Sequence, residues 1–265
     1  MKVLIKVGGT LLDEPDSRNA IANQLADIAR EHEVLVVHGG GKQVTRFLEE
    51  RGVSTRFVDG LRVSDEAVID AVTKVIAGSV NKQLVSAIIR AGKLAVGLSG
   101  VDGLLTHAMP LHPELGFVGN PTTTDPRLID SFINLGYLPV IACIAADEHG
   151  NIYNVNADQM AVSCALCWPS DTLILLTDVD GVQDKHGKVL GELSLDDIED
   201  LIASGVASRG MRAKLTSAAD AMRAGLQEVV IASGHESRIC QRILSGEAIG
   251  TRLCSEHVFA RGLVP

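Results

Sequence analysis

Two lysines and one aspartate are the side chains whose placement could serve chemistry on an anion. Lys6 lies inside the apolar segment 3–7, directly before a glycine pair. A lysine buried there without a partner is costly, so it either reaches solvent from an edge strand or presents a fixed cation to a phosphate. Lys214 could be an ordinary solvated helix lysine. Asp158 could be a helix N-cap, or it could lie between the two lysines and hold them in position.

Three expected strands end in glycine-rich turns. These turns are Gly8-Gly9, Gly39-Gly40-Gly41 and the segment 100–103. Ligands of open α/β sheets bind beyond the carboxyl ends of the strands, where glycines let backbone N–H groups approach an anion. Each turn alone could be a tight connection, but three of them favour an anion site. The triple glycine is not a P-loop, because the first glycine of that spacing is absent and Gln43 replaces the Ser or Thr that would bind magnesium.

Strands and helices alternate along the chain. Apolar runs predict strands at 3–7, 34–37, 94–98, 138–141, 172–177 and 228–232. Helical spacing, caps and stop residues predict helices at 17–30, 42–51, 64–92, 125–135, 156–168, 194–205, 211–223 and 235–244. The segment 104–121 predicts hairpins, and Ser64 is the expected N-cap of its helix. The pattern predicts an α/β fold with a mainly parallel sheet, shared by an N-terminal lobe, 1–155, and a C-terminal lobe, 156–265.

Composition narrows the function classes. Hydrophobic residues make up 46% of the chain and aromatic residues only 3%, which suits parallel strands buried on both faces. The net charge of −9 disfavours nucleic acid and anionic membranes as partners. No targeting segment is visible and the apolar runs are too short to span a bilayer, so we expect a soluble, cytoplasmic protein. The five cysteines are odd in number and their spacing gives no framework, so the sequence does not indicate a disulfide scaffold.

Taken together, these segments resemble the amino acid kinase family. The resemblance is carried, in chain order, by KVGGT (6–10), HGGG (38–41), DGLRV (59–63), NVNADQ (154–159) and LTDVDGV (176–182). It covers nearly the whole chain. The first motif is shared widely, whereas the triple glycine, GLRV and NVNADQ together are fairly specific.

The resemblance implies a three-layer αβα sandwich whose N-terminal lobe binds an amino acid and whose C-terminal lobe binds ATP with Mg²⁺. Lys6 and Lys214 would stabilise the transferring phosphoryl group, and Asp158 would orient both lysines. The amino acid would be held by Gly40, Gly41, Arg62 and Asn154. The nucleotide site would be lined by Gly8, Gly9, Thr177, Asp178, Gly181, Val182, Gly210 and Met211. The N–H groups of Gly9 and Gly41 would also face the phosphoryl group.

Within the family, the motifs are most similar to the branch that phosphorylates the γ-carboxylate of N-acetyl-L-glutamate with ATP, in arginine biosynthesis. A γ-carboxylate has a reference pKa of about 4.3 and is ionised at neutral pH. The nucleophile therefore needs no general base, and His38, the histidine nearest the site, is interpreted as structural. Two lysines, glycine N–H groups and Mg²⁺ would offset the repulsion between two anions. No side chain is assigned to the metal, because the nucleotide phosphates would hold it.

Two alternatives follow from the same residues. The family usually places a hydrophobic residue and a proline where this chain has Arg212 and Ala213, and Arg209 adds a further charge before Gly210. That charge resembles relatives that phosphorylate aminoadipate carried on a small acidic protein, although these are expected to lack the triple glycine and NVNADQ. The other alternative is a non-catalytic sensor of amino acid and nucleotide. The intact pair of lysines with its aspartate argues against a sensor.

The resemblance also bears on assembly. Arginine-inhibited relatives carry a helix before the first strand and form hexamers through it. This chain starts at the strand, so we expect an arginine-insensitive homodimer. The segments His235-Glu236 and Gly250-Thr251 lie where inhibited relatives bind arginine, which argues against arginine insensitivity.

Overall fold

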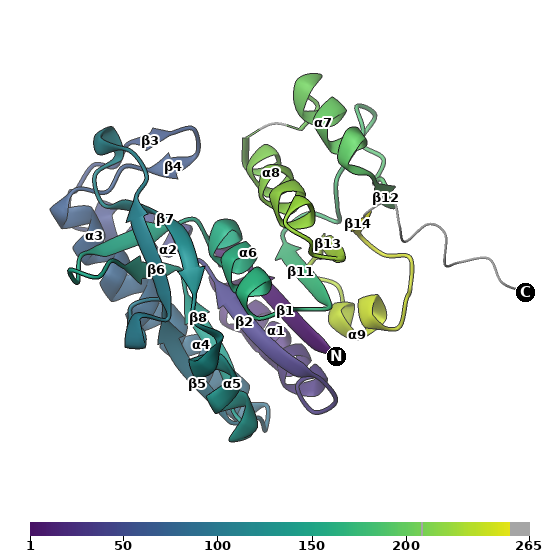
Figure 1. Ribbon diagram of the computed structural model, residues 1–265, viewed down its shortest axis with the longest axis horizontal. Coiled ribbons are helices and arrows are strands. Elements are labelled where there is room, and N and C mark those ends of the chain that lie inside the picture. Colours follow the sequence, from purple (N-terminus) through teal and green to yellow (C-terminus); the bar gives the residue numbers. More distant parts are fainter. Residues whose placement is uncertain (208, 255–265) are drawn as a thin grey trace, which may run out of the picture.

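One sheet runs through both halves of the chain. The computed structural model describes residues 1–207 and 209–254 (Figure 1), so the segment 255–265 of the expected C-terminal lobe and Ser208 lie outside it. The strand order is β12-β14-β13-β11-β1-β2-β8-β5. The strands are β1 Lys2–Val7, β2 Glu33–His38, β5 Ala95–Ser99, β8 Leu138–Ala142, β11 Thr172–Thr177, β12 Glu192–Leu193, β13 Glu228–Ser233 and β14 Thr251–Cys254.

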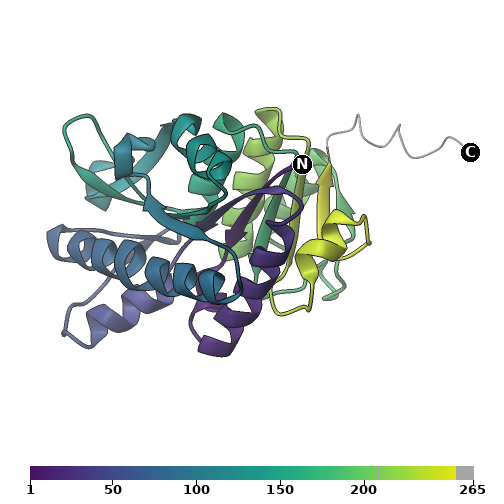
Figure 2. The same ribbon diagram turned by 90° about the horizontal axis from the view of Figure 1, so that it is seen from below.

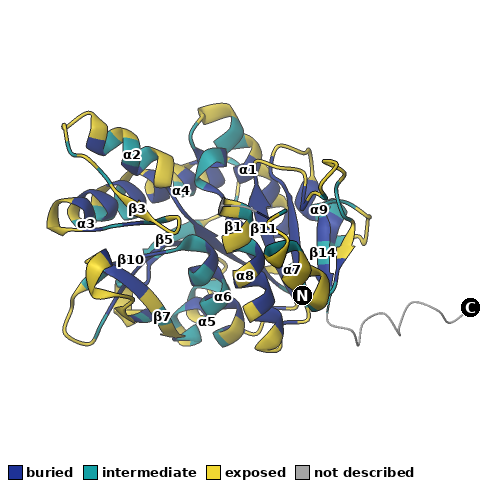
Figure 3. Cartoon of the chain, turned by 90° about the horizontal axis from the view of Figure 1, so that it is seen from above, coloured by how far each residue is buried: buried dark blue, intermediate teal, exposed yellow. Residues whose placement is uncertain are grey.

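The centre of this sheet is parallel. β1 pairs in parallel with β2 on one side and β11 on the other, so Lys6 lies opposite Val37 and Leu175. The apolar residues of these strands are buried (Figure 3), as expected for strands covered on both faces. The predicted, mainly parallel sheet is confirmed. β14 runs antiparallel to β13, and the edge strand β12 runs parallel to β14, so these two strands run opposite to the others.

Helices cover both faces of the sheet. α1 (Pro15–Ile28) and α4 (Asn81–Arg90) lie on one face, whereas α6 (Ala157–Cys167) and α8 (Arg209–Arg223) lie on the other (Figure 2). The remaining α-helices are α2 Gly41–Glu49, α3 Glu66–Val72, α5 Pro126–Asn134, α7 Leu195–Ala203 and α9 Ile239–Leu244. The three-layer αβα arrangement expected from the resemblance is confirmed.

The long helical stretch before β5 contains a π-helical segment, η2 (Thr73–Val80), between α3 and α4. The apolar residues at four-residue steps from Val68 to Ile88 are all buried. A four-residue step exceeds the 3.6 residues of an α-turn, so an apolar stripe would drift around a pure α-helix. The wider π turns rotate the stripe back. Ile76 and Val80 of this segment pack on Gly40, where an added Cβ would lie 3.2 Å and 3.4 Å from their side chains.

Two predicted helix starts are wrong. The N-cap of α3 is Asp65, whose carboxylate accepts a hydrogen bond from the N–H of Val68 at 2.9 Å. Ser64 is buried one residue earlier and is used in the candidate site. α9 begins at Ile239 and not at 235, because Arg238 has a φ of 54° and interrupts the helical path. A sequence pattern cannot reveal such a left-handed residue in advance.

Four short strands close into a small barrel beside the main sheet. β6 (Thr106–Pro110) and β7 (Val118–Thr124) form the hairpin that the sequence predicts. β9 (Ile144–Ala146) and β10 (Ile152–Val155) complete the barrel and were not predicted. β10 leads into α6, so the barrel positions Asn154 and the start of that helix.

A second small hairpin lies at the carboxyl end of the sheet. It consists of β3 (Phe57–Val58) and β4 (Leu61–Arg62). Its two-residue turn has positive φ at Asp59 (49°) and Gly60 (82°), the geometry that favours Asp-Gly in tight hairpins. This hairpin places Arg62 next to the glycine turns.

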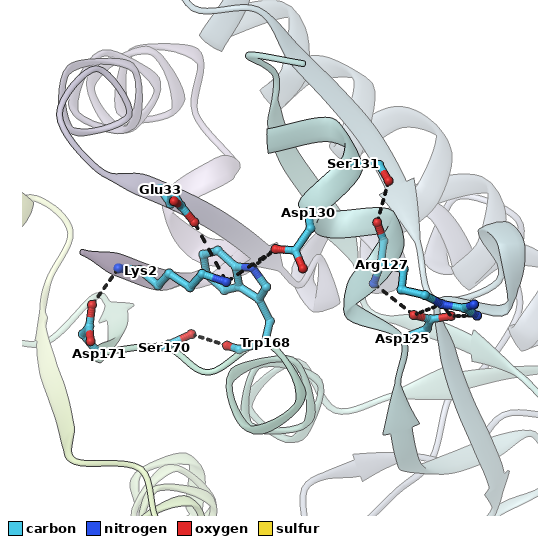
Figure 4. Close-up of polar contacts among 9 residues, drawn as sticks. All are labelled: Lys2, Glu33, Asp125, Arg127, Asp130, Ser131, Trp168, Ser170 and Asp171. Carbon is cyan, nitrogen blue, oxygen red and sulfur yellow. Dashed lines mark hydrogen bonds and ion pairs between the residues drawn. The ribbon is translucent and has the colours of Figure 1, made fainter. Parts of the chain in front are cut away.

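The amino end of β1 is held by a separate polar cluster (Figure 4). The Nζ atom of Lys2 lies 4.9 Å from the ring centroid of Trp168 and 3.4 Å from Oδ1 of Asp130. The indole N–H of Trp168 donates to the same carboxylate oxygen at 2.9 Å. The backbone N–H of Lys2 donates to Asp171 at 2.7 Å. These contacts attach α5 and α6 to the amino end of β1, which is the end away from the glycine turns.

Candidate active site

Lys6, Asp158 and Lys214 meet at the carboxyl end of β1. The Nζ atom of Lys6 lies 2.8 Å from Oδ1 of Asp158. The ammonium of Lys214 donates to Oδ2 of the same carboxylate at 3.3 Å. The three side chains come from β1, α6 and α8, and those of Lys6 and Asp158 are only 6% exposed. The structure therefore brings Asp158 between two lysines that are more than 200 positions apart in the sequence.

Asp158 is free to hold the lysines because another residue caps α6. The N-cap is Asn156, whose Oδ1 accepts hydrogen bonds from the N–H groups of Asp158 at 2.8 Å and Gln159 at 3.3 Å. Asp158 stands in the first turn of the helix, where a negative charge is favourable. Its carboxylate is thus left for the two ammonium groups, and the alternative that it is merely an N-cap is wrong.

The charges of this cluster follow from burial and mutual attraction. Burial by itself would raise the pKa of Asp158, but Lys6 and Lys214 outweigh it and hold that pKa below its usual value. Burial and the nearby charge of Lys6 lower the pKa of Lys214. Two ammonium groups around one carboxylate leave a surplus of positive charge at the end of β1. Such a surplus attracts an anion.

A cavity of about 250 Å³ opens beside this cluster. Its polar wall includes Lys6, Gly9, Gly40, Gly41, Arg62 and Asn154. Within residues 1–207 and 209–254, no acceptor takes a hydrogen bond from the backbone N–H of Gly9, Gly40 or Gly41. These donors and the lysines therefore make the cavity suitable for an anionic ligand.

Arg62 is buried with half of its guanidinium engaged. Its Nη2 donates to the carbonyl oxygen of Gly41 at 2.9 Å and to Oγ1 of Thr45 at 2.7 Å, and its Cζ lies 4.7 Å from the ring centroid of Phe57. Its Nη1 is buried, and no group in the described residues accepts a hydrogen bond from it. A buried, unpaired donor is costly, so this atom is placed to bind an acceptor brought by a ligand. Burial lowers the pKa of Arg62 below its ordinary value.

Hydrogen bonds connect Asn154 to Arg62 through Ser64, the residue that was wrongly predicted as a helix N-cap. The Nδ2 atom of Asn154 donates to Oγ of Ser64 at 3.2 Å, and Ser64 in turn donates to the carbonyl oxygen of Arg62 at 2.9 Å. This chain of bonds links β10 to the β3–β4 hairpin across the cavity. All four residues expected to hold the amino acid, Gly40, Gly41, Arg62 and Asn154, line the cavity.

The cavity also has an apolar wall, which was not predicted from the sequence. That wall includes Val44, Phe57, Val72, Ile76, Val118 and Cys143. Burial raises the pKa of Cys143 to about 12, so its side chain is a neutral thiol at physiological pH. Phe57 is an exposed residue of the β3–β4 hairpin, and nothing in the sequence distinguishes the other residues from ordinary core positions.

Only some of the residues expected around the nucleotide lie near the cluster of Lys6, Asp158 and Lys214. Asp178, directly after β11, acts electrostatically on Lys214, and Thr177 donates to the Asp178 carboxylate at 3.1 Å. The N–H of Gly8 is bound to the carbonyl oxygen of Leu176 at 3.0 Å. Gly8 therefore joins β1 to β11 and has no N–H to offer a phosphate.

The other residues expected around the nucleotide lie in the loop after β11 and at the start of α8. The N–H of Val182 donates to Oγ1 of Thr251 at 2.8 Å, and a Cβ on Gly181 would lie 2.7 Å from the same oxygen. The side chain of Met211 packs against the core. None of these three residues, nor Gly8, Thr177 or Asp178, lines either of the two cavities described here.

A larger cavity of about 1100 Å³ continues from the cluster between the β3–β4 hairpin and α8. It shares Asp158 and Lys214 with the smaller cavity and includes Gly210 and Arg212. The extra positive charge expected at Arg212 therefore faces this space. The side chain of Arg209 lies outside the described residues.

Comparison with known proteins identifies the family. The family model described as the amino acid kinase family matches residues 1–233. The chain belongs to the amino acid kinase family. The resemblance read from the motifs is confirmed.

Two relatives carry the same name. An acetylglutamate kinase of Solibacter usitatus is 52% identical over 254 residues, which are 96% of this chain and 99% of that protein. An acetylglutamate kinase of Acidobacterium capsulatum is 40% identical over 248 residues, covering 92% and 95% of the two chains.

Solved structures share the fold. N-acetylglutamate synthase of Neisseria gonorrhoeae aligns with a TM-score of 0.86 at 22% identity, over 96% of this chain and 59% of that one. The protein smu.665 of Streptococcus mutans aligns with a TM-score of 0.80 at 25% identity, over 96% and 98%. In the part of the chain that the structure describes, no helix has the length and apolar character needed to cross a membrane.

Proposed function

We propose that this member of the amino acid kinase family is an acetylglutamate kinase. It transfers the γ-phosphoryl group of ATP to the γ-carboxylate of N-acetyl-L-glutamate and forms N-acetyl-L-glutamyl 5-phosphate, a step of arginine biosynthesis. The observation that carries the proposal is the carboxylate of Asp158 between the ammonium groups of Lys6 and Lys214, on the wall of a cavity of about 250 Å³. The relative at 52% identity supports the choice of substrate.

The reaction brings together two anions. An oxygen of the substrate carboxylate forms a bond to the γ-phosphorus, the bond from that phosphorus to the bridging oxygen breaks, and ADP leaves with the electron pair. The carboxylate is ionised at neutral pH, so no residue has to remove a proton. Phosphoryl transfer of this kind depends mainly on positioning and charge stabilisation. Lys6 and Lys214 supply the charge, and Asp158 keeps both ammonium groups at one point.

The cavity supports binding of an N-acylated acidic amino acid. We assign the free Nη1 of Arg62 to the α-carboxylate of the substrate, because an arginine fork suits a carboxylate. Asn154, on the other side of the cavity, is assigned to the acylated amide. The apolar wall around Ile76 and Val118 would cover the acetyl methyl group and the side-chain carbons.

The nucleotide is proposed to lie over the carboxyl ends of β1 and β11, next to Asp178, Gly210 and Met211. Mg²⁺ would arrive with the nucleotide and be held mainly by its phosphates. Within the described residues, no group of three His, Cys, Asp or Glu side chains gathers around a metal position. Asp158 is already neutralised by two lysines. The ion would supply charge stabilisation to the phosphates while the lysines act on the transferring group.

We retain a cytoplasmic homodimer as part of the proposal. β5 is the last strand of its sheet, and exposed apolar side chains lie at its start and on the adjoining loop. They are Leu94 (58% exposed), Leu135 (70%) and Tyr137 (37%). A contact through this edge would cover them. Light scattering on the purified protein tests this point, and a monomeric mass at micromolar concentration would reject it.

One assay tests the proposed activity. The purified chain is incubated with ATP, Mg²⁺ and hydroxylamine, which traps acyl phosphates as hydroxamates, and with N-acetyl-L-glutamate, free L-glutamate or N-acetyl-L-aspartate. We expect hydroxamate with N-acetyl-L-glutamate and little with the other two. No hydroxamate with any small carboxylate would reject the proposal and favour a carrier-linked substrate or a sensor.

A further inference from the structure

His38 ends β2 directly before the triple glycine turn and has no part in the proposed chemistry. Its side chain is fully buried. One ring nitrogen, Nδ1, lies 2.9 Å from the carbonyl oxygen of Gly39, and the other, Nε2, lies 3.0 Å from Nδ2 of Asn81. Asn81 stands at the start of α4 and is also fully buried. A histidine and an asparagine thus connect the glycine turn to a helix 40 residues away in the sequence.

The neighbours of this pair decide where its protons lie. A carbonyl oxygen can only accept, so Nδ1 of His38 must carry the proton that it donates to Gly39. The amide of Asn81 is oriented by two bonds: its Nδ2 donates to the carbonyl oxygen of Val140 at 2.9 Å, and its Oδ1 accepts from Lys82 at 3.1 Å. Its Nδ2 therefore donates to Nε2 of His38, which is the acceptor. The ring is neutral and held in one tautomer, in agreement with burial, which lowers the pKa of His38 to about 4.

The bond to Gly39 fixes the orientation of one peptide unit. The carbonyl of Gly39 and the N–H of Gly40 belong to the same planar trans peptide and point in opposite directions. Because the carbonyl is turned toward the buried ring, the N–H of Gly40 is turned away from it. Gly40 lines the cavity of about 250 Å³, and no acceptor among the described residues takes its hydrogen bond.

We infer that His38 and Asn81 are positioning residues that orient the Gly39–Gly40 peptide, so that the N–H of Gly40 is presented to the anionic group bound in the cavity. This inference rests on the proposed function. It assigns a task in the reaction to two buried side chains that touch neither substrate. Glycine has the greatest backbone freedom of any residue. A turn of three glycines therefore needs a hydrogen bond from a residue outside it to keep one peptide in one orientation.

Two variants separate positioning from simple stability. The amide nitrogen of an asparagine side chain takes nearly the place of Nδ1 of histidine, whereas the carbonyl oxygen of a glutamine side chain can take the place of Nε2. His38→Asn therefore keeps the donor to Gly39 and loses the acceptor for Asn81. His38→Gln keeps the acceptor and loses the donor. Both should lower thermal stability to a similar degree, but only His38→Gln should lower kcat strongly, by about 10²-fold.

Trp168→Phe is the matched control. It removes a part-buried hydrogen bond, from the indole N–H to Asp130, near the amino end of β1 (Figure 4). It should lower thermal stability and leave kcat unchanged. Equal values of kcat for His38→Asn, His38→Gln and the unmodified chain would overturn the inference.

Nuclear magnetic resonance gives a readout that does not depend on activity. At pH 7 the ¹⁵N spectrum should show Nδ1 of His38 protonated and Nε2 unprotonated. The amide proton of Gly40 should shift further in His38→Gln than in His38→Asn, because both variants remove the ring but only His38→Gln releases the peptide. A ring protonated at Nε2, or a Gly40 amide that ignores both variants, would reject the inference. Absence of hydroxamate formation by the unmodified chain would instead reject the proposed function, while these spectra would still decide the role of His38.

Discussion

Gly9 and Gly40 touch backbone to backbone. A Cβ atom built on Gly9 would lie 3.1 Å from both the nitrogen and the Cα of Gly40. Gly9 follows β1 and Gly40 follows β2, two neighbouring parallel strands. The glycines at these strand ends therefore let two turns approach closely enough for their N–H groups to serve one anion.

Gly9→Ala should separate these turns and lower kcat. The new methyl group would press on backbone atoms that cannot rotate away, and a displacement of about 1 Å in a catalytic group costs about 10²-fold in rate. Steady-state kinetics of the hydroxamate reaction measures the effect. Gly78→Ala is the control, because a Cβ there has no neighbour within 4 Å. Similar turnover by both variants would show that close packing of the turns is unimportant.

Lys6→Ala should lower kcat by about 10²- to 10³-fold, since its charge matters most when the phosphoryl group is between donor and acceptor. Substrate KM should change much less. Lys2→Ala is the matched control, because Lys2 lies at the other end of the same strand and pairs with Asp130 (Figure 4). Near-normal turnover of Lys6→Ala would remove this lysine from the mechanism.

Asp158→Asn should move the high-pH limb of activity toward lower pH. The carboxylate favours the charged form of Lys214, whereas burial and Lys6 oppose it, so without the carboxylate the pKa of Lys214 falls further. The active, protonated lysine is then lost at a lower pH than in the unmodified chain. The pH profile of kcat measures the shift. Asp130→Asn, which changes a carboxylate beside Lys2, should leave the profile in place, and an unmoved profile for Asp158→Asn would contradict the assigned role.

Arg62→Ala should raise the KM for N-acetyl-L-glutamate by about 10- to 100-fold, which corresponds to the loss of one or two charged hydrogen bonds. Turnover at saturation should fall less, because the α-carboxylate does not change during the reaction. Arg46→Ala is the control: Arg46 is an exposed arginine that pairs with Asp13 at 2.7 Å. An unchanged KM for Arg62→Ala would mean that this guanidinium does not contact the substrate.

His38 should make the protein less stable in mild acid. Burial lowers the pKa of His38 from 6.5 to about 4, so between these values the unfolded chain binds a proton that the folded chain does not. Stability therefore falls as the pH drops through this window, by up to about 3 kcal/mol from this residue. Urea unfolding at pH 7 and pH 5 measures the change. His38→Asn should lose less stability over the same interval, and identical losses would show that the histidine does not titrate as described.

Much of the main sheet was predictable, because strands buried on both faces leave continuous apolar runs such as 172–177. The strands that were missed are short. β12 (Glu192–Leu193) has two residues, and β14 includes Arg252, so neither forms a recognisable apolar run. β9 and β10 are held by closure of the small barrel, a long-range relation that a local pattern does not contain.

The site was predictable in a different way. Lys6 attracts notice by itself, as a charge inside an apolar strand, but nothing local separates Lys214 or Arg62 from surface residues. The family resemblance supplied their roles. Geometry then added what no motif states: the free Nη1 of Arg62, the place of Ser64 between Asn154 and Arg62, and the apolar wall.

The pairing of β1 with β11 has a mechanical meaning. Lys6 lies on β1 and Lys214 lies on α8, which follows β11 in the chain, and parallel hydrogen bonds join β1 to β11. A movement that brings the nucleotide and the amino acid together would therefore have to bend or twist the sheet at the pairing of β1 with β11. Because Asp158 binds both Lys6 on β1 and Lys214 on α8, we expect the reacting atoms to lie where such bending displaces them least.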